Sequence, residues 1–239
     1  MTDVKKPLVT EYLKSRSFDD LSKEHGVNAS GVERQGDGKF VLNYDQFEAK
    51  KGDTLAEQCR GLVIRVVNTN NLTSDRIVGA VKLLAWPMDR FYDYTDPAAA
   101  KIDWSDPLLR VCEKLDGTMI VLYWDTDLVH WCIATRNVPE ADVSIRVGHL
   151  VYGDKTFSQL FCETFESTCD DLDKNVTYVF ELTSPLNRII VKYDKPRVTL
   201  IAARNILTGE EQDTRGLCHL TGVTLPQRWQ IGGIVGTPS

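Results

Sequence analysis

The sequence of 239 residues has no hydrophobic run that approaches the length of a membrane-spanning helix. Its first residues, Met-Thr-Asp-Val-Lys-Lys-Pro, also lack the apolar segment of a signal peptide. We therefore expect a protein that makes no membrane contact and that works in the cytoplasm.

Closely spaced metal ligands are missing as well. The chain has four histidines and six cysteines, and no two cysteines form a Cys-x-x-Cys pair. This spacing gives no sign of a zinc site and predicts free thiols in a reducing compartment. The cysteines lie far apart, mostly within apolar segments, at Cys59, Cys112, Cys132, Cys162, Cys169 and Cys218.

An excess of positive charge is absent, since the formal net charge is −6 at pH 7. A protein that binds nucleic acid without discrimination usually presents a basic surface, so the charge argues against that class. It does not exclude a local cationic groove.

What the sequence does contain is a series of short apolar, β-branched segments separated by polar turns. Helical spacing of apolar residues occurs near the N-terminus, in 1–25, and again in 139–172, whereas 26–38 and 68–76 are rich in turn residues. Such a pattern predicts an α+β domain with antiparallel sheets. The predicted strands are 40–44, 62–67, 77–84, 118–124, 129–135, 178–182, 189–191 and 198–203.

One stretch combines a charged turn with a core strand, Cys112-Glu-Lys-Leu-Asp-Gly-Thr-Met-Ile-Val-Leu-Tyr123. Lys114 stands two residues before the pair Asp116-Gly117. A lysine that is desolvated among other cations loses its proton more easily and can act as a nucleophile. The alternative is a surface hairpin turn, for which Asp-Gly supplies the backbone geometry.

Other charged residues also mark the ends of predicted strands. Arg60 could bind a phosphate or form a salt bridge, and Arg90 stands in a segment rich in aromatic residues that suits a base, a phosphate or plain packing. Glu181 interrupts an apolar strand and could accept a ribose hydroxyl or pair with Arg188. If these ends converge on Lys114, they form a cationic pocket for a nucleotide.

Four segments, taken in order, resemble the covalent nucleotidyltransferases, and in particular the RNA ligases of the phage tRNA-repair type (RNA ligase 1-like). The resemblance covers roughly 40–210 and is strongest in the Lys-x-Asp-Gly and Ser-Pro-x-Asn-Arg-Ile motifs. The segments are Cys59-Arg-Gly61, Pro87-Met-Asp-Arg-Phe-Tyr92, Lys114-Leu-Asp-Gly117 and Phe180-Glu-Leu-Thr-Ser-Pro-Leu-Asn-Arg-Ile189.

This resemblance implies an adenylation domain that uses ATP with Mg²⁺, or Mn²⁺ in its place. Lys114 would carry AMP and pass it to an RNA 5′-phosphate, and a 3′-hydroxyl would then displace AMP to seal the strand; nicked tRNA is one candidate substrate. The implied catalytic residues are Lys114, Asp116 and Gly117, the implied nucleotide contacts are Arg60, Arg90, Lys114, Arg136 and Glu181, and the implied RNA contacts are Asn187 and Arg188, with no metal ligand assigned.

The sequence departs from the family pattern at several points. Arg90 replaces a lysine, Asn137 a glycine and Gly232 a metal-binding glutamate, and no Lys-x-Lys strand follows. The resemblance therefore implies a single adenylyltransferase domain over 1–239 that stops before the last family motifs and lacks the RNA-specificity domain, with attack on ATP impaired most. A binding module for nucleotides or RNA ends that has lost the chemistry is the alternative, and a capping guanylyltransferase is a third.

Overall fold

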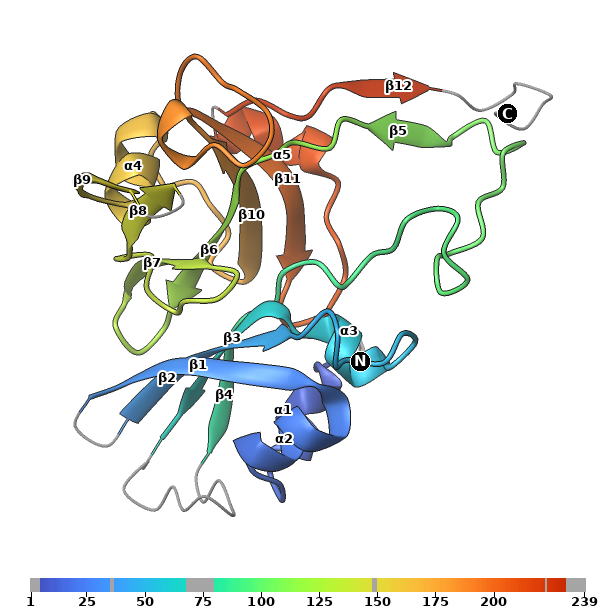
Figure 1. Ribbon diagram of the computed structural model, residues 1–239, viewed down its shortest axis with the longest axis vertical. Helices are drawn as coiled ribbons and strands as arrows, with labels where there is room; N and C mark the ends of the chain where they lie inside the picture. The colour runs from blue at the N-terminus through green and yellow to red at the C-terminus, as the bar shows by residue number, and fades with distance from the viewer. Residues whose placement is uncertain (1–4, 35–36, 68–79, 148–149, 222, 231–239) are drawn as a thin grey trace.

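Two four-stranded antiparallel sheets lie face to face in the computed structural model, which describes residues 5–34, 37–67, 80–147, 150–221 and 223–230 (Figure 1). The first sheet has the strand order β1-β2-β3-β4, with β1 Val27–Arg34, β2 Asp37–Tyr44, β3 Arg60–Val66 and β4 Val81–Ala85. The second has the order β11-β10-β6-β7, with β6 Thr118–Asp125, β7 His130–Thr135, β10 Val176–Thr183 and β11 Arg197–Asn205. The predicted α+β class with antiparallel sheets is confirmed.

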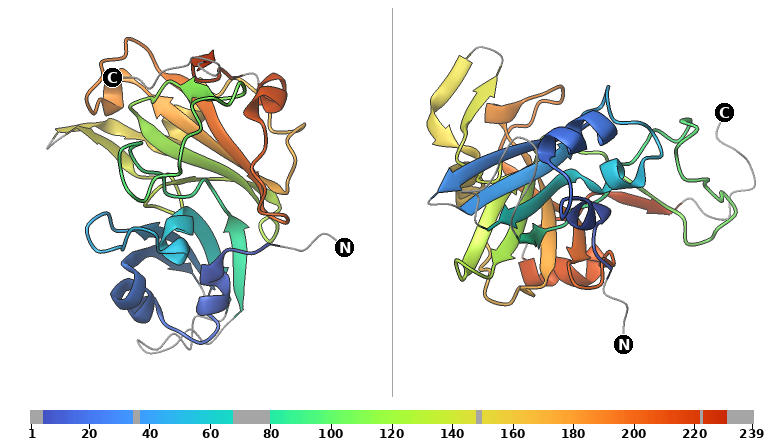
Figure 2. Two further views of the ribbon diagram at one scale, coloured as in Figure 1. Left: turned by 90° about the vertical axis from the view of Figure 1, so that its right-hand side faces the viewer. Right: turned by 90° about the horizontal axis from the view of Figure 1, so that it is seen from below.

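Helices cover the outer face of each sheet, so the layers run helix, sheet, sheet, helix (Figure 2). The first sheet packs against α1 Leu8–Tyr12, α2 Phe18–His25 and α3 Thr54–Gln58, and the second against α4 Phe157–Thr164 and α5 Thr214–Thr221. Among the described residues no helix is both long and apolar enough to cross a membrane.

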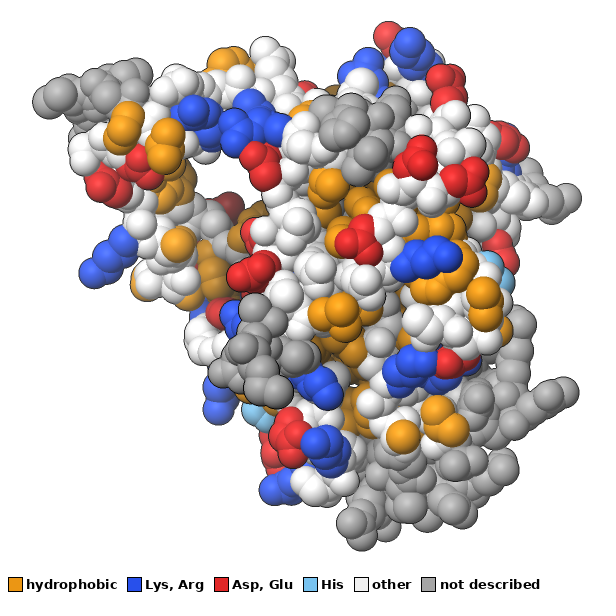
Figure 3. Space-filling view, turned by 180° about the vertical axis from the view of Figure 1, so that it is seen from behind, with side chains coloured by type: hydrophobic (Ala, Val, Ile, Leu, Met, Phe, Trp, Pro, Cys, Tyr) orange, Lys and Arg blue, Asp and Glu red, His pale blue; other side chains and the backbone are white. Residues whose placement is uncertain are grey.

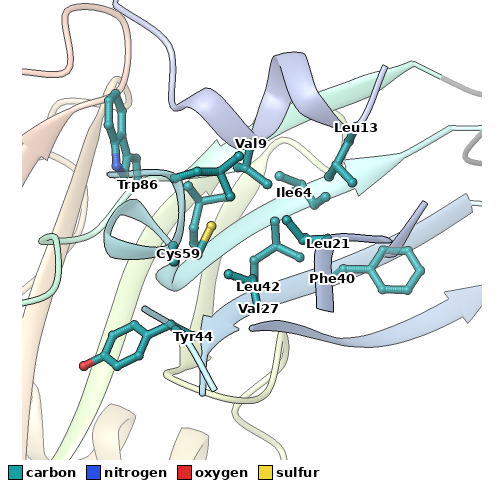
Figure 4. Packing of buried hydrophobic residues seen from close by; sticks show 14 of the residues in the cluster. Val9, Leu13, Leu21, Val27, Phe40, Leu42, Tyr44, Cys59, Ile64 and Trp86 are labelled. Carbon is teal, nitrogen blue, oxygen red and sulfur yellow. The ribbon is translucent and has the colours of Figure 1, made fainter. Parts of the chain in front are cut away.

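The side chains of the central strands alternate between two cores, as the period of two in a strand requires. On β3, Leu62 and Ile64 face the helices, whereas Val63 faces the second sheet. On β6, Val121 faces the first sheet, and its neighbour Ile120 packs on the α4 side. Figure 4 shows the core under α1 and α2, where Leu42 and Ile64 meet Val9, Leu13 and Leu21.

The ends of the longer helices are fixed by local signals. The Ser17 hydroxyl accepts a hydrogen bond from the Asp20 N–H, and the Asp20 carboxylate accepts one from the Ser17 N–H, so α2 begins with a capping box. It ends at Gly26, where φ is 62° and a Cβ would lie 2.5 Å from the Ala49 nitrogen. Both features require glycine at this position.

A cluster of charged side chains joins the two sheets at their edge, and we call it the inter-sheet ion cluster. The Asp125 side chain has no exposed area, and its Oδ2 lies 2.6 Å from Arg65 Nη2 and 3.2 Å from Lys39 Nζ. Asp127 pairs with Arg65 at 3.3 Å and with Lys82. The cations come from the first sheet, and the acids come from the end of β6 and the turn that follows it, so the cluster ties the two sheets together.

Three details of the predicted secondary structure are wrong. Within the predicted loop 26–38, residues 27–34 form strand β1 and residues 37–38 begin β2. In 139–172, β8 (Ser144–Val147) pairs antiparallel with β9 (Leu150–Thr156), and of the residues described in this range only α4 is helical. Residues 189–191 follow the 3-10 turn η2 (Pro185–Asn187) without forming a strand. The predicted turn 68–76 and the first residues of the predicted strand 77–84 lie outside the described residues.

Candidate functional site

The lysine turn connects a short strand to a central strand of the second sheet. β5, Arg110–Cys112, pairs with β12, Arg228–Gln230, and residues 113–117 then lead into β6. Lys114 is exposed in this turn. The expectation of a desolvated lysine is therefore wrong, because the turn holds the Lys114 side chain at an open surface.

Gly117 lies where no side chain fits. A Cβ on Gly117 would lie 2.4 Å from the carbonyl oxygen and 2.9 Å from the carbonyl carbon of Leu182 on β10. The Gly117 N–H donates a hydrogen bond of 2.9 Å to Glu181 Oε1. The Asp-Gly pair therefore brings the lysine turn against β10, and Gly117 is the residue that makes the close approach.

Replacing Gly117 by alanine is expected to displace the turn from β10, since backbone rather than a flexible side chain blocks the new methyl group. Overpacking of this kind costs about 1–3 kcal/mol of unfolding free energy. Urea denaturation of Gly117→Ala beside the wild type measures this loss. Gly52 also has open space around it but is a poor control because its φ is 83°, so Gly216→Ala, with open space and no such φ, serves instead. Equal stability of Gly117→Ala and Gly216→Ala would contradict the close packing.

Asp116 fastens a second segment to the lysine turn. Its Oδ2 accepts hydrogen bonds of 2.7 Å from the N–H groups of Ile190 and Val191, and its own N–H donates to Tyr193 Oη at 3.1 Å. The bonds from Val191 and Ile190 hold the pKa of Asp116 below its ordinary value, so the carboxylate stays ionised. Asp116 thus acts on the position of the turn rather than as a proton donor.

Three arginines from separate segments surround the ring of Tyr44. Arg90 Cζ lies 4.4 Å and Arg136 Cζ 4.8 Å from the ring centroid, and the Arg60 guanidinium lies near enough to the Tyr44 hydroxyl to interact with it electrostatically. Burial lowers the pKa of Arg60, and the nearby charge of Arg136 lowers it further. Arg60, Arg90 and Arg136, three of the implied nucleotide contacts, therefore lie near one another in the structure.

A cavity of about 370 Å³ opens beside the lysine turn. Arg60, Lys114 and Glu181 supply polar groups to its wall, together with Glu113 and Arg228. The remaining lining is mostly apolar and consists of Met88, Phe91, Cys112, Leu115, Ile201 and Pro226. Arg90 and Arg136, which contact the ring of Tyr44, are not among the lining residues.

Glu181 points its carboxylate at the lysine turn from β10. Burial raises the pKa of Glu181 above its ordinary value, although the Gly117 N–H and the charges of Arg60 and Lys114 act in the opposite direction. The alternative pairing of Glu181 with Arg188 is not what the structure shows. Arg188 is exposed, and its Nε donates to Ile190 O at 3.3 Å.

Asn187 lies inside the fold, with 5% of its surface exposed. Its Nδ2 donates to Thr118 Oγ1 at 3.1 Å and to Leu182 O at 3.0 Å, so it joins the start of β6 to the end of β10. Of the two residues predicted to contact RNA, Arg188 is exposed, whereas Asn187 is buried and supports the backbone beneath the lysine turn.

Arg228 joins the site without having been predicted from the sequence. It lies on β12 opposite Cys112 and lines the cavity beside Lys114. Its neighbours, Gln227 and Trp229, belong to no recognised motif, and the pairing of β12 with β5 joins segments more than a hundred residues apart. An arginine next to an aromatic residue is the available signal, and the same signal also marks Arg90.

The described residues contain no group of three or more His, Cys, Asp or Glu side chains that could hold a metal ion. A metal cage made by the protein alone is therefore not supported within these ranges, and Gly232 lies outside them.

A family model described as RNA ligase matches residues 58–219, well over half of the chain. The chain belongs to the RNA ligase family. The match includes every predicted site residue from Arg60 to Arg188, whereas Arg228 lies beyond it. The predicted resemblance to RNA ligases is confirmed at the level of the family.

Two curated relatives of this RNA ligase chain are viral. It is 29% identical over 175 residues to an RNA ligase of Rhodothermus phage RM378, which covers 62% of this chain and 37% of the relative. It is also 29% identical over 190 residues to a putative bifunctional polynucleotide kinase/RNA ligase of Autographa californica nuclear polyhedrosis virus, over 72% of this chain and 24% of that protein. The chain thus spans well under half the length of either relative.

Among solved structures, an archaeal ATP-dependent RNA ligase is similar to this chain, with 13% sequence identity and a TM-score of 0.47. The superposition covers 90% of this chain and 54% of the archaeal chain. A likeness of this size carries no argument about function.

Proposed function

We propose that this chain is the adenylation domain of an ATP-dependent RNA ligase and that Lys114 is its nucleophile. The observation that carries the proposal is the single cavity that brings Lys114, Arg60 and Glu181 together from three separate segments. An amine beside a buried guanidinium and a carboxylate suits a nucleotide, whose phosphate and ribose need opposite kinds of partner.

The first step is nucleophilic substitution at phosphorus. The Lys114 amine attacks the α-phosphorus of ATP and forms a P–N bond, while the bond from the α-phosphorus to the bridging oxygen breaks. The electron pair of that bond leaves with pyrophosphate, and the amine proton goes to solvent. Arg60, with its fixed fork of N–H donors, holds the α-phosphate oxygens as negative charge develops.

The rest of the nucleotide fits the other walls of the cavity. The apolar side, with Phe91 and Ile201, takes the adenine ring, and Arg60 Cζ already lies 4.6 Å from the Phe91 ring centroid. Glu181 accepts a hydrogen bond from a ribose hydroxyl. Mg²⁺, or Mn²⁺ in its place, supplies charge neutralisation when it arrives with the phosphates of ATP.

The later steps transfer AMP from Lys114 to an RNA 5′-phosphate, after which a 3′-hydroxyl displaces AMP and joins the strands. Arg188, which is exposed, contacts the RNA backbone, and Asn187 supports the site by holding the end of β10 to the start of β6. Nicked tRNA is one substrate with both required ends. The cytoplasm, as a reducing compartment, suits the free cysteines.

The test is incubation of the chain with α-labelled ATP or α-labelled GTP and magnesium, followed by a denaturing gel. We expect label from ATP to remain on the protein through denaturation. Label from GTP instead would favour a capping guanylyltransferase. ATP binding without label would overturn the ligase proposal and favour a binding module.

A further inference from the structure

A second hollow, of about 510 Å³, lies on the arm formed by β5 and β12. We call it the arginine hollow, and its lining residues are Leu108, Arg110, Asp213, Arg215, Arg228 and Gln230. In Figure 3 the Lys and Arg side chains gather over this arm, beside an opening between the arm and the body of the molecule. Three of the six residues that line the arginine hollow are arginines, although the net charge of the chain is negative.

The arginine hollow adjoins the lysine cavity. Arg228 lines both, and in the β5–β12 ladder it pairs with Cys112, which stands two residues before Lys114. A single extended ligand can therefore bind at Lys114 in the lysine cavity and reach past Arg228 into the arginine hollow.

The charges of the hollow favour an anion. The carboxylate in its lining, Asp213, is paired with Arg215, whose hydrogen bonds lower the pKa of Asp213 to about 2. The charges of Asp213 and Arg215 offset each other in this ion pair, so the hollow keeps the positive charges of Arg110 and Arg228. Two like charges that line one hollow repel each other, and an anion bound between them offsets this repulsion.

Within the described part of the chain, neither of these two arginines forms a salt bridge with an acid. Arg110 is exposed and donates to the backbone oxygens of Pro107 and Leu109 at 3.2 and 3.1 Å. Arg228 Nη2 donates to Thr214 Oγ1 at 2.5 Å, and its Nε is buried with no hydrogen-bond partner among the described residues. A buried guanidinium N–H without an acceptor is costly, and a bound oxyanion would supply the acceptor.

We propose that the arginine hollow binds the β- and γ-phosphates of the nucleotide, with Arg228 at the bridge between the α-phosphate and the tail and Arg110 at its far end. The inference rests on the proposed function, because it takes Lys114 to mark the α-phosphate. The hollow holds the group that becomes pyrophosphate when the P–N bond forms. It thereby lines up the leaving group and takes up the charge that moves onto it.

A binding measurement tests the site without any catalysis. Inorganic pyrophosphate is titrated by calorimetry into the wild type, Arg110→Gln, Arg228→Gln and the double variant, with Lys101→Ala as the control that removes an exposed positive charge elsewhere. We expect each single change to weaken binding roughly tenfold, the value of one charge-assisted hydrogen bond, and Lys101→Ala to bind as the wild type does. No binding by the wild type, or equal binding by all variants, would overturn the proposal.

A kinetic measurement separates the phosphate tail from RNA as the occupant. In Arg110→Gln, the ATP concentration for half-maximal labelling is expected to rise roughly tenfold, because the lost contact is to the tail. Sealing of RNA that already carries a 5′-adenylyl group is expected to stay unchanged, since that step releases no pyrophosphate. Loss of sealing with unchanged labelling would show that the hollow binds RNA and would overturn the proposal. A wild type that binds pyrophosphate but never labels would overturn the proposed function and leave the arginine hollow supported.

Discussion

Alanine in place of Lys114 is expected to abolish covalent labelling by α-labelled ATP, to below about one thousandth of the wild-type level. The variant lacks the atom that forms the P–N bond, because that bond requires a nucleophilic nitrogen. Lys114 is the lysine among the described residues that line the cavity. The labelled band on a denaturing gel, quantified over time, measures the effect.

Lys114→Ala is expected to fold as the wild type does, so a loss of labelling reports on the chemistry and not on unfolding. Lys114 is exposed, and neither Gly117 nor Asp116 depends on its side chain for the hydrogen bonds that shape the turn. Lys114→Arg keeps the charge but presents a guanidinium that stays protonated, so it should also fail to label. Lys101→Ala is the matched control and should label normally. Label that persists on Lys114→Ala would move the nucleophile elsewhere in the chain.

Asparagine in place of Asp125 is expected to lower the free energy of unfolding by about 3–5 kcal/mol, the usual cost of removing one partner of a buried ion pair. Asp125 is fully buried, and its loss leaves both Lys39 and Arg65 with one acid fewer at the junction of the sheets. Urea denaturation measures the change. Asp127→Asn is the control from the same cluster, and because Asp127 is 38% exposed its loss should cost less than about 1 kcal/mol. Equal losses in both variants would contradict the role given to burial.

The same residue sets a pH dependence. Burial acts to raise the pKa of Asp125, but the N–H groups of Leu128 and Asp127 and the charge of Lys39 outweigh it, so the pKa lies below the ordinary value of 3.8. A carboxyl group with a lowered pKa in the folded protein stabilises it above the unfolded pKa and ceases to do so as the pH falls through the folded value. The wild type should therefore lose stability more steeply than Asp125→Asn below about pH 4. Parallel curves of unfolding free energy against pH would contradict this.

The strands that could be predicted from the sequence are those with an apolar side chain at nearly every position, namely β3, β6 and β10. Strand β1 could not be, because Asn28, Ser30 and Gly31 are typical of turns. The structure shows why glycine is there: a Cβ on Gly31 would lie 2.0 Å from the ring of Phe40 on β2. The aromatic ring covers the glycine, and this cross-strand contact carries no signal in the local sequence.

The residues of the candidate site also fall into those that the sequence could predict and one that it could not. Arg60, Lys114 and Glu181 stand at the ends of apolar strands, where a charge is conspicuous, and the structure brings them into one cavity. Arg228 is placed by the pairing of β12 with β5, which is a long-range contact. Such pairings follow from the folded sheet and not from any local pattern of residues.

The ring of Tyr44 has a consequence for how folding and ligand binding are coupled. Arg60, Arg90 and Arg136 are held near one side chain, where the cation–π contacts of Arg90 and Arg136 with the ring offset part of the repulsion among three like charges. The repulsion that remains raises the electrostatic free energy of the folded chain, and a bound polyanion would lower it. A polyanion that binds at these arginines is therefore expected to raise the free energy of unfolding as its concentration rises.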